Sequence, residues 1–292
     1  GQYLITFIHP ASPVNHDMVR KMAAQGVIGL TLDGVPRISR AQNLDALTSM
    51  STCAGYKGIL MAANDLASFF PQMFTAVGPI RPANVLVIGV GVAGLQALAT
   101  ARRLGAVTYA ADIRPAAAEQ AKSLGAKVVD TGVPEALAVG EGGYAQHLPE
   151  AELLKERERL AEVVKDMDVI FCSALVPGKI APVVITEDMV KSMKRGSVIV
   201  DIAIDQGGNC AITPAGSREV KYGVTLEGIK NIPGMLPHSS TWMFSQNMYN
   251  LVKYLVKDDQ VVLDMNDEIC RSILVTQDGE IVHKGAREAM GM

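Results

Sequence analysis

The most constraining feature of the chain is a glycine pattern, Gly89-x-Gly91-x-x-Gly94. The apolar run 85–90 predicts a buried strand before it, and the segment 93–104 predicts a helix after it. In that context the first glycine permits a tight turn, the second lets the backbone approach a pyrophosphate, and the third lets the helix pack on the strand. Amide groups at the start of the helix then face the phosphates. The pattern predicts a dinucleotide site, the alternative being that these glycines serve packing alone.

A carboxylate at the end of the next predicted strand indicates which dinucleotide. Asp112 ends the strand 107–112 and lies 112 minus 94, or 18, residues beyond Gly94. A carboxylate there accepts hydrogen bonds from the adenosine ribose hydroxyls and repels a 2′-phosphate, which favours NAD(H) over NADP(H). Arg114 leaves two interpretations open, since its guanidinium can reach a phosphate or stack on adenine.

Strands and helices alternate through the central part of the chain. This alternation predicts an α/β fold with a Rossmann-type, doubly wound parallel sheet. The region 130–149 interrupts it, and loops of that length are usually functional or mobile. The predicted strands are 85–90, 107–112, 127–129, 168–174, 197–203 and 224–229, and the predicted helices are 93–104, 116–124, 150–165 and 187–193.

A second, smaller α/β domain is expected from the two ends of the chain. Predicted strands 3–8 and 27–32 flank a helix at 17–25, and the opening directly on a strand suggests a domain truncated at its N-terminus. A helix at 239–256 and a hairpin at 273–284, with Asp278-Gly279 at its turn, are expected to return to it. We therefore expect residues 1–53 and 237–292 to form this domain, and 54–236 to form the Rossmann domain with a linking helix near 54–70 after the polar segment 37–50.

Composition excludes several classes of function. The net charge of -3 gives no basic face for nucleic acid. Four widely separated cysteines without a Cys-x-x-Cys pair suggest neither a disulfide framework nor a metal site, and favour a reducing compartment. The uncharged run 82–101 is long enough for a membrane span, but its glycines and polar residues favour a strand and turn instead.

Several motifs together resemble the NAD(H)-binding domain of proton-translocating NAD(P) transhydrogenase alpha subunits. They are Pro36-Arg-Ile-Ser-Arg-Ala-Gln-Asn-Leu-Asp45, Ala54-Gly-Tyr-Lys57, Gly89-Val-Gly-Val-Ala-Gly-Leu95, Gly142-Gly-Tyr-Ala145, Ala174-Leu-Val-Pro-Gly-Lys179 and Gly207-Gly-Asn-Cys210. The resemblance spans nearly the whole chain, and it extends to alanine dehydrogenases, which share the architecture.

The transhydrogenase resemblance implies specific residue roles. It puts Arg37, Gln42 and Asp45 near the nicotinamide end of the cofactor, with Thr48 where the family usually has serine. These four are the expected catalytic residues, acting by position, because hydride transfer between nicotinamide rings needs no general base. The expected NAD(H)-binding residues are Arg37, Ile38, Ser39, Gln42, Asp45, Gly89, Gly91, Val92, Ala93, Gly94, Asp112, Ile113, Arg114, Gly143, Tyr144 and Leu175. Ordinary core packing is the alternative for Val92 and Leu175.

The same resemblance implies a larger assembly. The region 130–147 corresponds to a loop that closes over the nucleotide in that family and carries Tyr144, which would exclude water. NADP(H) would bind on a separate partner domain, and a membrane domain would couple hydride transfer to protons. We therefore expect a homodimeric, peripheral component on the cytoplasmic or mitochondrial matrix side, with no transmembrane segment of its own and no nucleic-acid partner.

Two other functions stay open at this point. His9 and Asp205 fall where alanine dehydrogenases carry catalytic residues, and an imidazole there would act as acid and base on the substrate. Against this, the substrate-binding arginine and lysine of that family have no counterpart here, and the 37–45 loop is foreign to it. His9 is otherwise a hydrogen-bonded residue at a strand end, and Asp205 orients the Gly207-Gly208 turn or a ribose. The third possibility is a non-catalytic NAD-binding module.

Overall fold

The computed structural model describes residues 2–140, 145–176 and 180–292, which form two compact units. Residues 1–50 and 237–292 make the first unit, and residues 51–236 make the second. The sequence-based expectation puts these boundaries at 53/54 and 236/237. Within the described residues no helix combines the length and apolar character that a membrane crossing requires.

The second unit is built on a seven-stranded sheet within the described residues, in the order β10-β11-β9-β8-β5-β6-β7. Every neighbouring pair is parallel except β10 and β11. The chain runs outward from β5 in both directions, so the carboxyl ends of β5 and β8 meet at the point where the winding reverses, which is where α/β sheets bind ligands. The strands are β5 (Asn84–Ile88), β6 (Val107–Ala111), β7 (Lys127–Val128), β8 (Val169–Cys172), β9 (Val198–Asp201), β10 (Arg218–Lys221) and β11 (Val224–Glu227).

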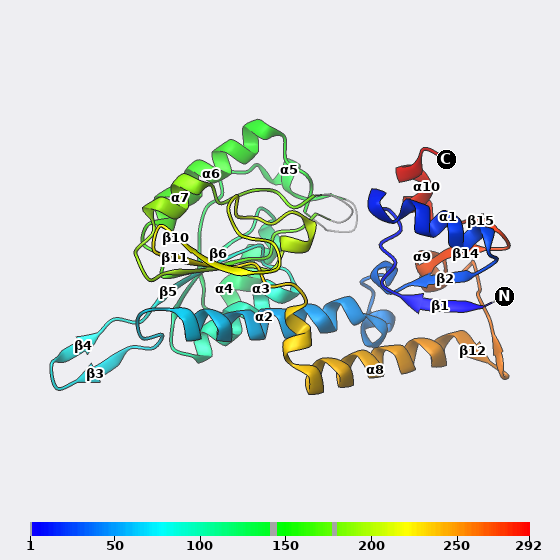
Figure 1. Ribbon diagram of the computed structural model, residues 1–292, viewed down its shortest axis with the longest axis horizontal. Coiled ribbons are helices and arrows are strands. Elements are labelled where there is room, and N and C mark those ends of the chain that lie inside the picture. The colour runs from blue at the N-terminus through cyan, green and yellow to red at the C-terminus, as the bar shows by residue number, and fades with distance from the viewer. Residues whose placement is uncertain (1, 141–144, 177–179) are drawn as a thin grey trace. The chain divides into compact units, whose positions relative to one another are not determined.

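Both faces of this sheet are buried because its central strands are almost entirely apolar. Val85 and Val87 pack into one hydrophobic cluster, whereas Leu86 and Ile88 pack into the other. Such alternation follows from the two-residue period of a strand, and two covered faces explain why the sequence shows continuous apolar runs. Figure 1 shows helices on both faces of the sheet.

The helices divide between the two clusters. One cluster takes residues from α2 (Ala46–Asp65), α3 (Val92–Arg103) and α4 (Pro115–Ser123), and the other takes residues from α6 (Glu150–Val164) and α7 (Glu187–Ser192). The unit also holds the short helix α5 (Glu135–Ala138), the hairpin β3 (Met73–Thr75) with β4 (Gly78–Ile80), and 3₁₀ turns at Ile204–Gln206 and Ile232–Met235.

The first unit joins segments from both ends of the chain in one sheet, in the order β1-β2-β14-β15. β1 (Tyr3–Thr6) and β2 (Ile28–Thr31) are parallel, while β14 (Leu274–Gln277) runs antiparallel to β2 and to β15 (Glu280–Ile281). Asp278 and Gly279 both have positive φ, at 52° and 82°, as the predicted tight hairpin requires.

Helices of the first unit pack against this sheet through two hydrophobic clusters. The helices are α1 (His16–Ala24), α8 (Pro237–Leu255), α9 (Glu268–Ile273) and α10 (Lys284–Met290), a small hairpin joins β12 (Val256–Lys257) to β13 (Gln260–Val261), and 3₁₀ turns lie at Pro13–Asn15, Leu32–Gly34 and Ser39–Leu44. The polar segment 37–50 is mostly helical, and α2 begins at Ala46 and ends at Asp65, which corrects the bounds 54–70 expected for the linking helix.

Candidate nucleotide-binding site

The glycine-rich turn follows β5, and its three glycines meet different surroundings. Gly89 has φ +83°, and a Cβ atom there would lie 2.5 Å from the nitrogen of Ala174. A Cβ on Gly94 would collide with the carbonyl oxygen of Gly89, so the helix packs directly on the turn. A Cβ on Gly91 would meet no heavy atom of the described residues within 4 Å. Gly91 therefore borders open space, as a backbone that approaches a pyrophosphate must.

The first turn of α3 carries backbone amide groups that have no acceptor within the helix itself. Gly91 is the N-cap residue and, having no side chain, makes no capping hydrogen bond. The amide groups of an uncapped helix start bind anions, and the helix dipole adds to the attraction. Val92 is half-buried and Ala93 is 7% exposed, packed in the core under the turn. The turn therefore fits a diphosphate group.

Asp112 lies beside the glycine turn, directly after β6. Its Oδ2 accepts a hydrogen bond from the nitrogen of Val90 at 2.7 Å, so the carboxylate is fixed against the turn itself. Its other partner is Arg114, which donates through Nε at 3.0 Å to Oδ1 and through Nη2 at 2.8 Å to Oδ2. Arg114 also donates through Nη2 to the carbonyl oxygen of Val90 at 3.3 Å. The structure thus pairs Arg114 with Asp112, a contact that sequence reasoning missed.

A second acidic side chain, which is buried, lies close enough to Asp112 to interact with its charge. Glu156 of α6 is 5% exposed, and its helix faces the cluster that packs against Ile113. Burial raises the pKa of Glu156 to about 7, and the charge of Asp112 adds to the rise while Arg157 opposes it. Glu156 therefore changes charge near neutral pH, close to the expected ribose-binding carboxylate.

The segment 173–175, which follows β8, lies against the glycine turn and forms a wall of the candidate site. The Ser173 hydroxyl donates to the carbonyl oxygen of Gly89 at 2.7 Å, which ties the two loops together. Leu175 follows and is 36% exposed. Gly143 and Tyr144 lie outside the described residues.

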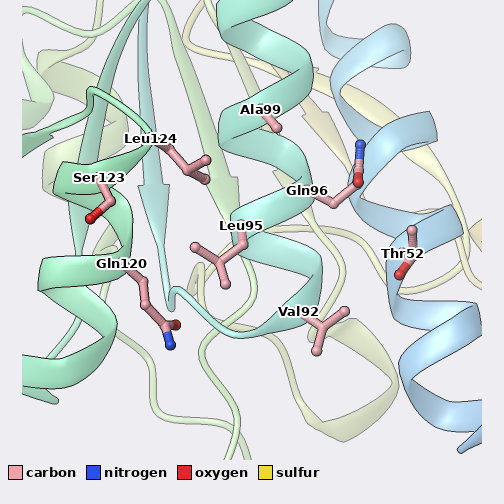
Figure 2. Close-up of a pocket in the computed structure, with 8 residues that line it drawn as sticks. All are labelled: Thr52, Val92, Leu95, Gln96, Ala99, Gln120, Ser123 and Leu124. Atoms are coloured by element: carbon pink, nitrogen blue, oxygen red, sulfur yellow. The ribbon is translucent and has the colours of Figure 1, made fainter. Parts of the chain in front are cut away.

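A cavity of about 500 Å³ opens on the outer side of α3. Figure 2 shows Val92, Leu95 and Gln96 of α3 among its lining side chains, with Gln120 and Ser123 of α4 on one side and Thr52 of α2 on the other. The lining carries no charged side chain, and it shares only Val92 with the expected site residues. The cavity therefore reaches the glycine turn only through Val92, and its polar lining residues Thr52, Gln96, Gln120 and Ser123 are all neutral, which does not suit a diphosphate.

The expected nicotinamide-contacting residues belong to the first unit. Arg37, Ser39 and Gln42 are exposed, and Ile38 is half-buried, in or next to the 3₁₀ turn Ser39–Leu44. Asp45 precedes α2 and accepts hydrogen bonds from the nitrogen of Thr48 at 2.8 Å and from its hydroxyl at 2.6 Å. Asp45 and Thr48 thus cap the helix, a structural role beside the expected contact with the cofactor.

His9 and Asp205 have different surroundings. His9 Nδ1 lies 3.3 Å from Asp33 Oδ2, and this hydrogen bond raises the pKa of His9 against the opposing effect of burial. Asp205 is exposed and lies 3.6 Å from Lys230 Nζ. The carboxylate that holds the Gly207-Gly208 turn is instead Asp201, which corrects the interpretation of Asp205 as the residue that orients this turn.

Comparison with known proteins identifies the family. Residues 1–54 match the family Alanine dehydrogenase/PNT, N-terminal domain, and residues 58–284 match Alanine dehydrogenase/PNT, C-terminal domain. The chain belongs to the alanine dehydrogenase/PNT family. The fold class expected from the sequence, a Rossmann-type domain with a second α/β domain, is confirmed by this match and by the relatives of known structure.

Within the alanine dehydrogenase/PNT family the transhydrogenases are the more similar branch. The chain is 42% identical to the first part of NAD(P) transhydrogenase subunit alpha of Rhodospirillum rubrum, over 96% of its own length and 73% of that protein. It is 42% identical to NAD(P) transhydrogenase subunit alpha of Cereibacter sphaeroides, of which it covers 54%. The crystal structure of transhydrogenase from Sinorhizobium meliloti superposes with a TM-score of 0.82 at 36% identity, covering 96% of this chain and 75% of that one.

Alanine dehydrogenases are more distant members of the same family. That of Staphylococcus saprophyticus is 29% identical over the whole chain and 74% of its own length. An L-alanine dehydrogenase structure superposes with a TM-score of 0.77 at 23% identity, covering 100% of this chain and 75% of that one, which shows a common fold. The chain is therefore a homologue of NAD(P) transhydrogenase subunit alpha, as the sequence motifs predict.

Proposed function

We propose that this chain is the NAD(H)-binding component of an NAD(P) transhydrogenase, which passes hydride between NAD(H) and NADP(H) held on a separate domain. The observation that carries the proposal is the junction of β5 and β6, where Val90 connects the glycine turn to Asp112 through a 2.7 Å hydrogen bond. Open space at Gly91 suits the diphosphate, and Asp112 suits the adenosine ribose hydroxyls.

The chain's own residues have a positioning task in this function. The cofactor supplies the hydride chemistry at its nicotinamide ring, and transfer between two such rings moves no proton at the reacting carbons. The turn residues Gly89, Gly91 and Gly94 orient the diphosphate, and Asp112 with Ile113 and Arg114 holds the adenosine half. We assign the nicotinamide end to Arg37, Gln42 and Asp45, with Thr48 supporting Asp45.

The test is hydride transfer from NADH to an NADP⁺ analogue, measured with this chain alone and after mixing with a transhydrogenase NADP(H)-binding domain. We expect transfer only in the mixture, because the chain itself provides one nucleotide site. Absence of transfer together with absence of NADH binding would overturn the proposal. Gel filtration with light scattering tests the expected homodimer, which rests on the resemblance alone.

Alanine dehydrogenase activity is the second candidate, and the His9–Asp33 pair favours it. A histidine held by a carboxylate through Nδ1 keeps Nε2 available for proton transfer. The control reaction is NADH with pyruvate and ammonium in the absence of any partner domain. Turnover there, and its loss in His9→Asn, would assign the chain to the dehydrogenases.

A further inference from the structure

Asn209 is a fully buried polar residue that the proposed function does not use. It is 0% exposed, and its side-chain amide makes three hydrogen bonds. Nδ2 donates to the carbonyl oxygens of Ala174 and Pro182, both at 2.8 Å, and Oδ1 accepts from the nitrogen of Ala174 at 2.9 Å. Asn209 therefore binds backbone at two points, of which Ala174 lies at the start of the segment after β8. An unmatched group at such a depth would be costly, so these contacts define the amide orientation.

The backbone of Asn209 is itself held in place by a buried carboxylate. Asp201, at the end of β9, is 0% exposed, and its Oδ2 accepts from the nitrogens of Asn209 at 2.8 Å and Cys210 at 2.9 Å. Gly208 has φ +82°, and a Cβ there would lie 2.9 Å from the same Oδ2. The Gly207-Gly208 turn thus passes close to the Asp201 carboxylate, and this close approach places Asn209 where its side chain can reach Ala174.

Ala174 links this buried network to the glycine turn. Its nitrogen is the atom that a Cβ on Gly89 would meet at 2.5 Å, so the two backbones are in direct contact. The neighbouring Ser173 hydroxyl donates to the carbonyl oxygen of Gly89 at 2.7 Å. A continuous path of packed and hydrogen-bonded groups therefore leads from the end of β9 through Asn209 and Ala174 to the diphosphate-binding turn.

We propose that Asn209 is a positioning residue for NAD(H). Its side-chain amide fixes Ala174, and through Ala174 it fixes both the segment 173–175 and the glycine turn against which the dinucleotide binds. This inference rests on the proposed function, because it assigns the ligand of the turn as NAD(H). Asn209 itself does not touch the cofactor. Its effect is on the precision of the site, and small displacements of binding groups cost affinity steeply.

The test compares Asn209→Asp with Thr276→Val in the full chain. The first change keeps the shape and the acceptor for Ala174 but replaces the Nδ2 donor with an oxygen facing two carbonyl groups. The control, Thr276→Val, also removes a fully buried hydrogen-bonding group, but in the first unit. The Thr276 hydroxyl donates to the carbonyl oxygen of Val27 at 2.7 Å and accepts from the nitrogen of Gly29 at 3.1 Å. NADH dissociation constants and thermal midpoints are measured for both.

We expect Asn209→Asp to raise the NADH dissociation constant roughly tenfold, with hydride transfer at saturating NADH within about twofold of wild type. Thr276→Val should keep the wild-type dissociation constant even though its thermal midpoint falls. Equal NADH affinity in wild type and folded Asn209→Asp would overturn the inference. Failure of the wild-type chain to bind NADH would instead overturn the proposed function.

Hydrogen exchange on the wild-type chain gives a second test that does not depend on a variant folding. If Asn209 positions the wall of the site, NADH should slow exchange at the amides of 173–176 and also at the buried amides of 208–210. Protection confined to the glycine turn, with no change at 208–210, would contradict the role of Asn209.

Discussion

Single residues in the glycine turn have separable roles, because a side chain at each of the three glycines would meet different surroundings. Gly89 needs positive φ and has Ala174 against it. Gly91 has φ −84°, and in the described part of the chain no heavy atom lies within 4 Å of the position that a methyl group would take. Gly91 is therefore the one fingerprint glycine at which an added methyl group leaves the protein itself unstrained. A substitution at Gly91 can therefore change the affinity for NADH without changing the free energy of unfolding.

We predict that Gly91→Ala weakens NADH binding at least about tenfold while the free energy of unfolding changes by less than about 1 kcal/mol. The methyl group occupies space needed by the diphosphate and touches nothing else. Gly89→Ala is the matched comparison and should lose about 2 kcal/mol or more of stability through backbone strain and collision. Titration with NADH and denaturant unfolding measure both quantities, and a stability loss in Gly91→Ala equal to that of Gly89→Ala would refute the distinction.

Asp112→Asn should weaken NADH binding by about 1–3 kcal/mol, because the charge that strengthens its hydrogen bonds to the ribose is lost. The control is Asp168→Asn. Like Asp112, Asp168 accepts hydrogen bonds from a backbone nitrogen, that of Asn84 at 2.8 Å, and from a cation, Lys194 Nζ at 2.9 Å. Asp168 precedes β8, however, so it lies at the amino ends of the parallel strands, away from the glycine turn. Equal losses of NADH affinity in the two variants would point to general destabilisation and away from a ribose contact.

The sequence predicts some of these residues and misses others for a physical reason. Glycine spacing and the strand-end carboxylate are local signals, so Gly91 and Asp112 can be found without a structure. The contacts of Asn209 join residues 35 and 27 positions apart in the chain, and no local pattern encodes them. The assignment of Arg37, Gln42 and Asp45 to the nicotinamide stays a prediction.

At the scale of elements, the sequence does not predict the bounds of helices and strands correctly where the apolar periodicity is weak. α2 begins at Ala46, eight residues before the expected Ala54, because the Asp45–Thr48 cap and not an apolar stripe marks its start. Gly55 and Gly58 lower its helix propensity, yet a Cβ at these positions would collide with Ala93 and Phe171, so close packing explains them. The apolar pattern does not predict strand β10, since most of its side chains face solvent at the antiparallel edge.

Helix α6 carries a buried proton-binding group that makes stability depend on pH. The folded protein raises the pKa of Glu156 from 4.5 to about 7, so its contribution to stability is present below pH 4.5 and is lost as pH rises through 7. Glu156→Gln removes this dependence. Between pH 5 and 8 the wild type should lose about 1–3 kcal/mol relative to the variant, measured by urea unfolding. A pH-independent difference between the two proteins would contradict the raised pKa.

Helix α9 shows the opposite dependence. Burial alone would raise the pKa of Asp267, but hydrogen bonds from Arg40 and Tyr254 outweigh it and hold the pKa at about 2. This stabilisation is present above pH 3.8 and is lost as pH falls through 2. Asp267→Asn should therefore destabilise the first unit by about 1–2 kcal/mol at pH 7. The difference from wild type should shrink toward pH 2 in acid unfolding followed by circular dichroism, and a constant difference would contradict it.

At the scale of the whole molecule, each unit closes its own hydrophobic core. The two large clusters of the second unit draw all their residues from 54–232, and those of the first unit draw theirs from 5–46 and 244–290. A fragment of residues 46–236, which keeps α2 complete, should therefore fold with a cooperative thermal transition. Calorimetry tests this expectation, and a fragment without a transition would show that the core needs the first unit.

The sheet of the first unit also sets an order of events during synthesis. Gly29 in β2 donates its backbone hydrogen bond to Thr276 in β14, 247 positions later. At ribosomal rates of about 5–20 residues per second, β2 waits roughly 10–50 seconds for its partner strand. The second unit emerges whole within that interval and can fold first. Until β14 is made, the edge of β2 that contains Leu30 therefore stays without its partner strand.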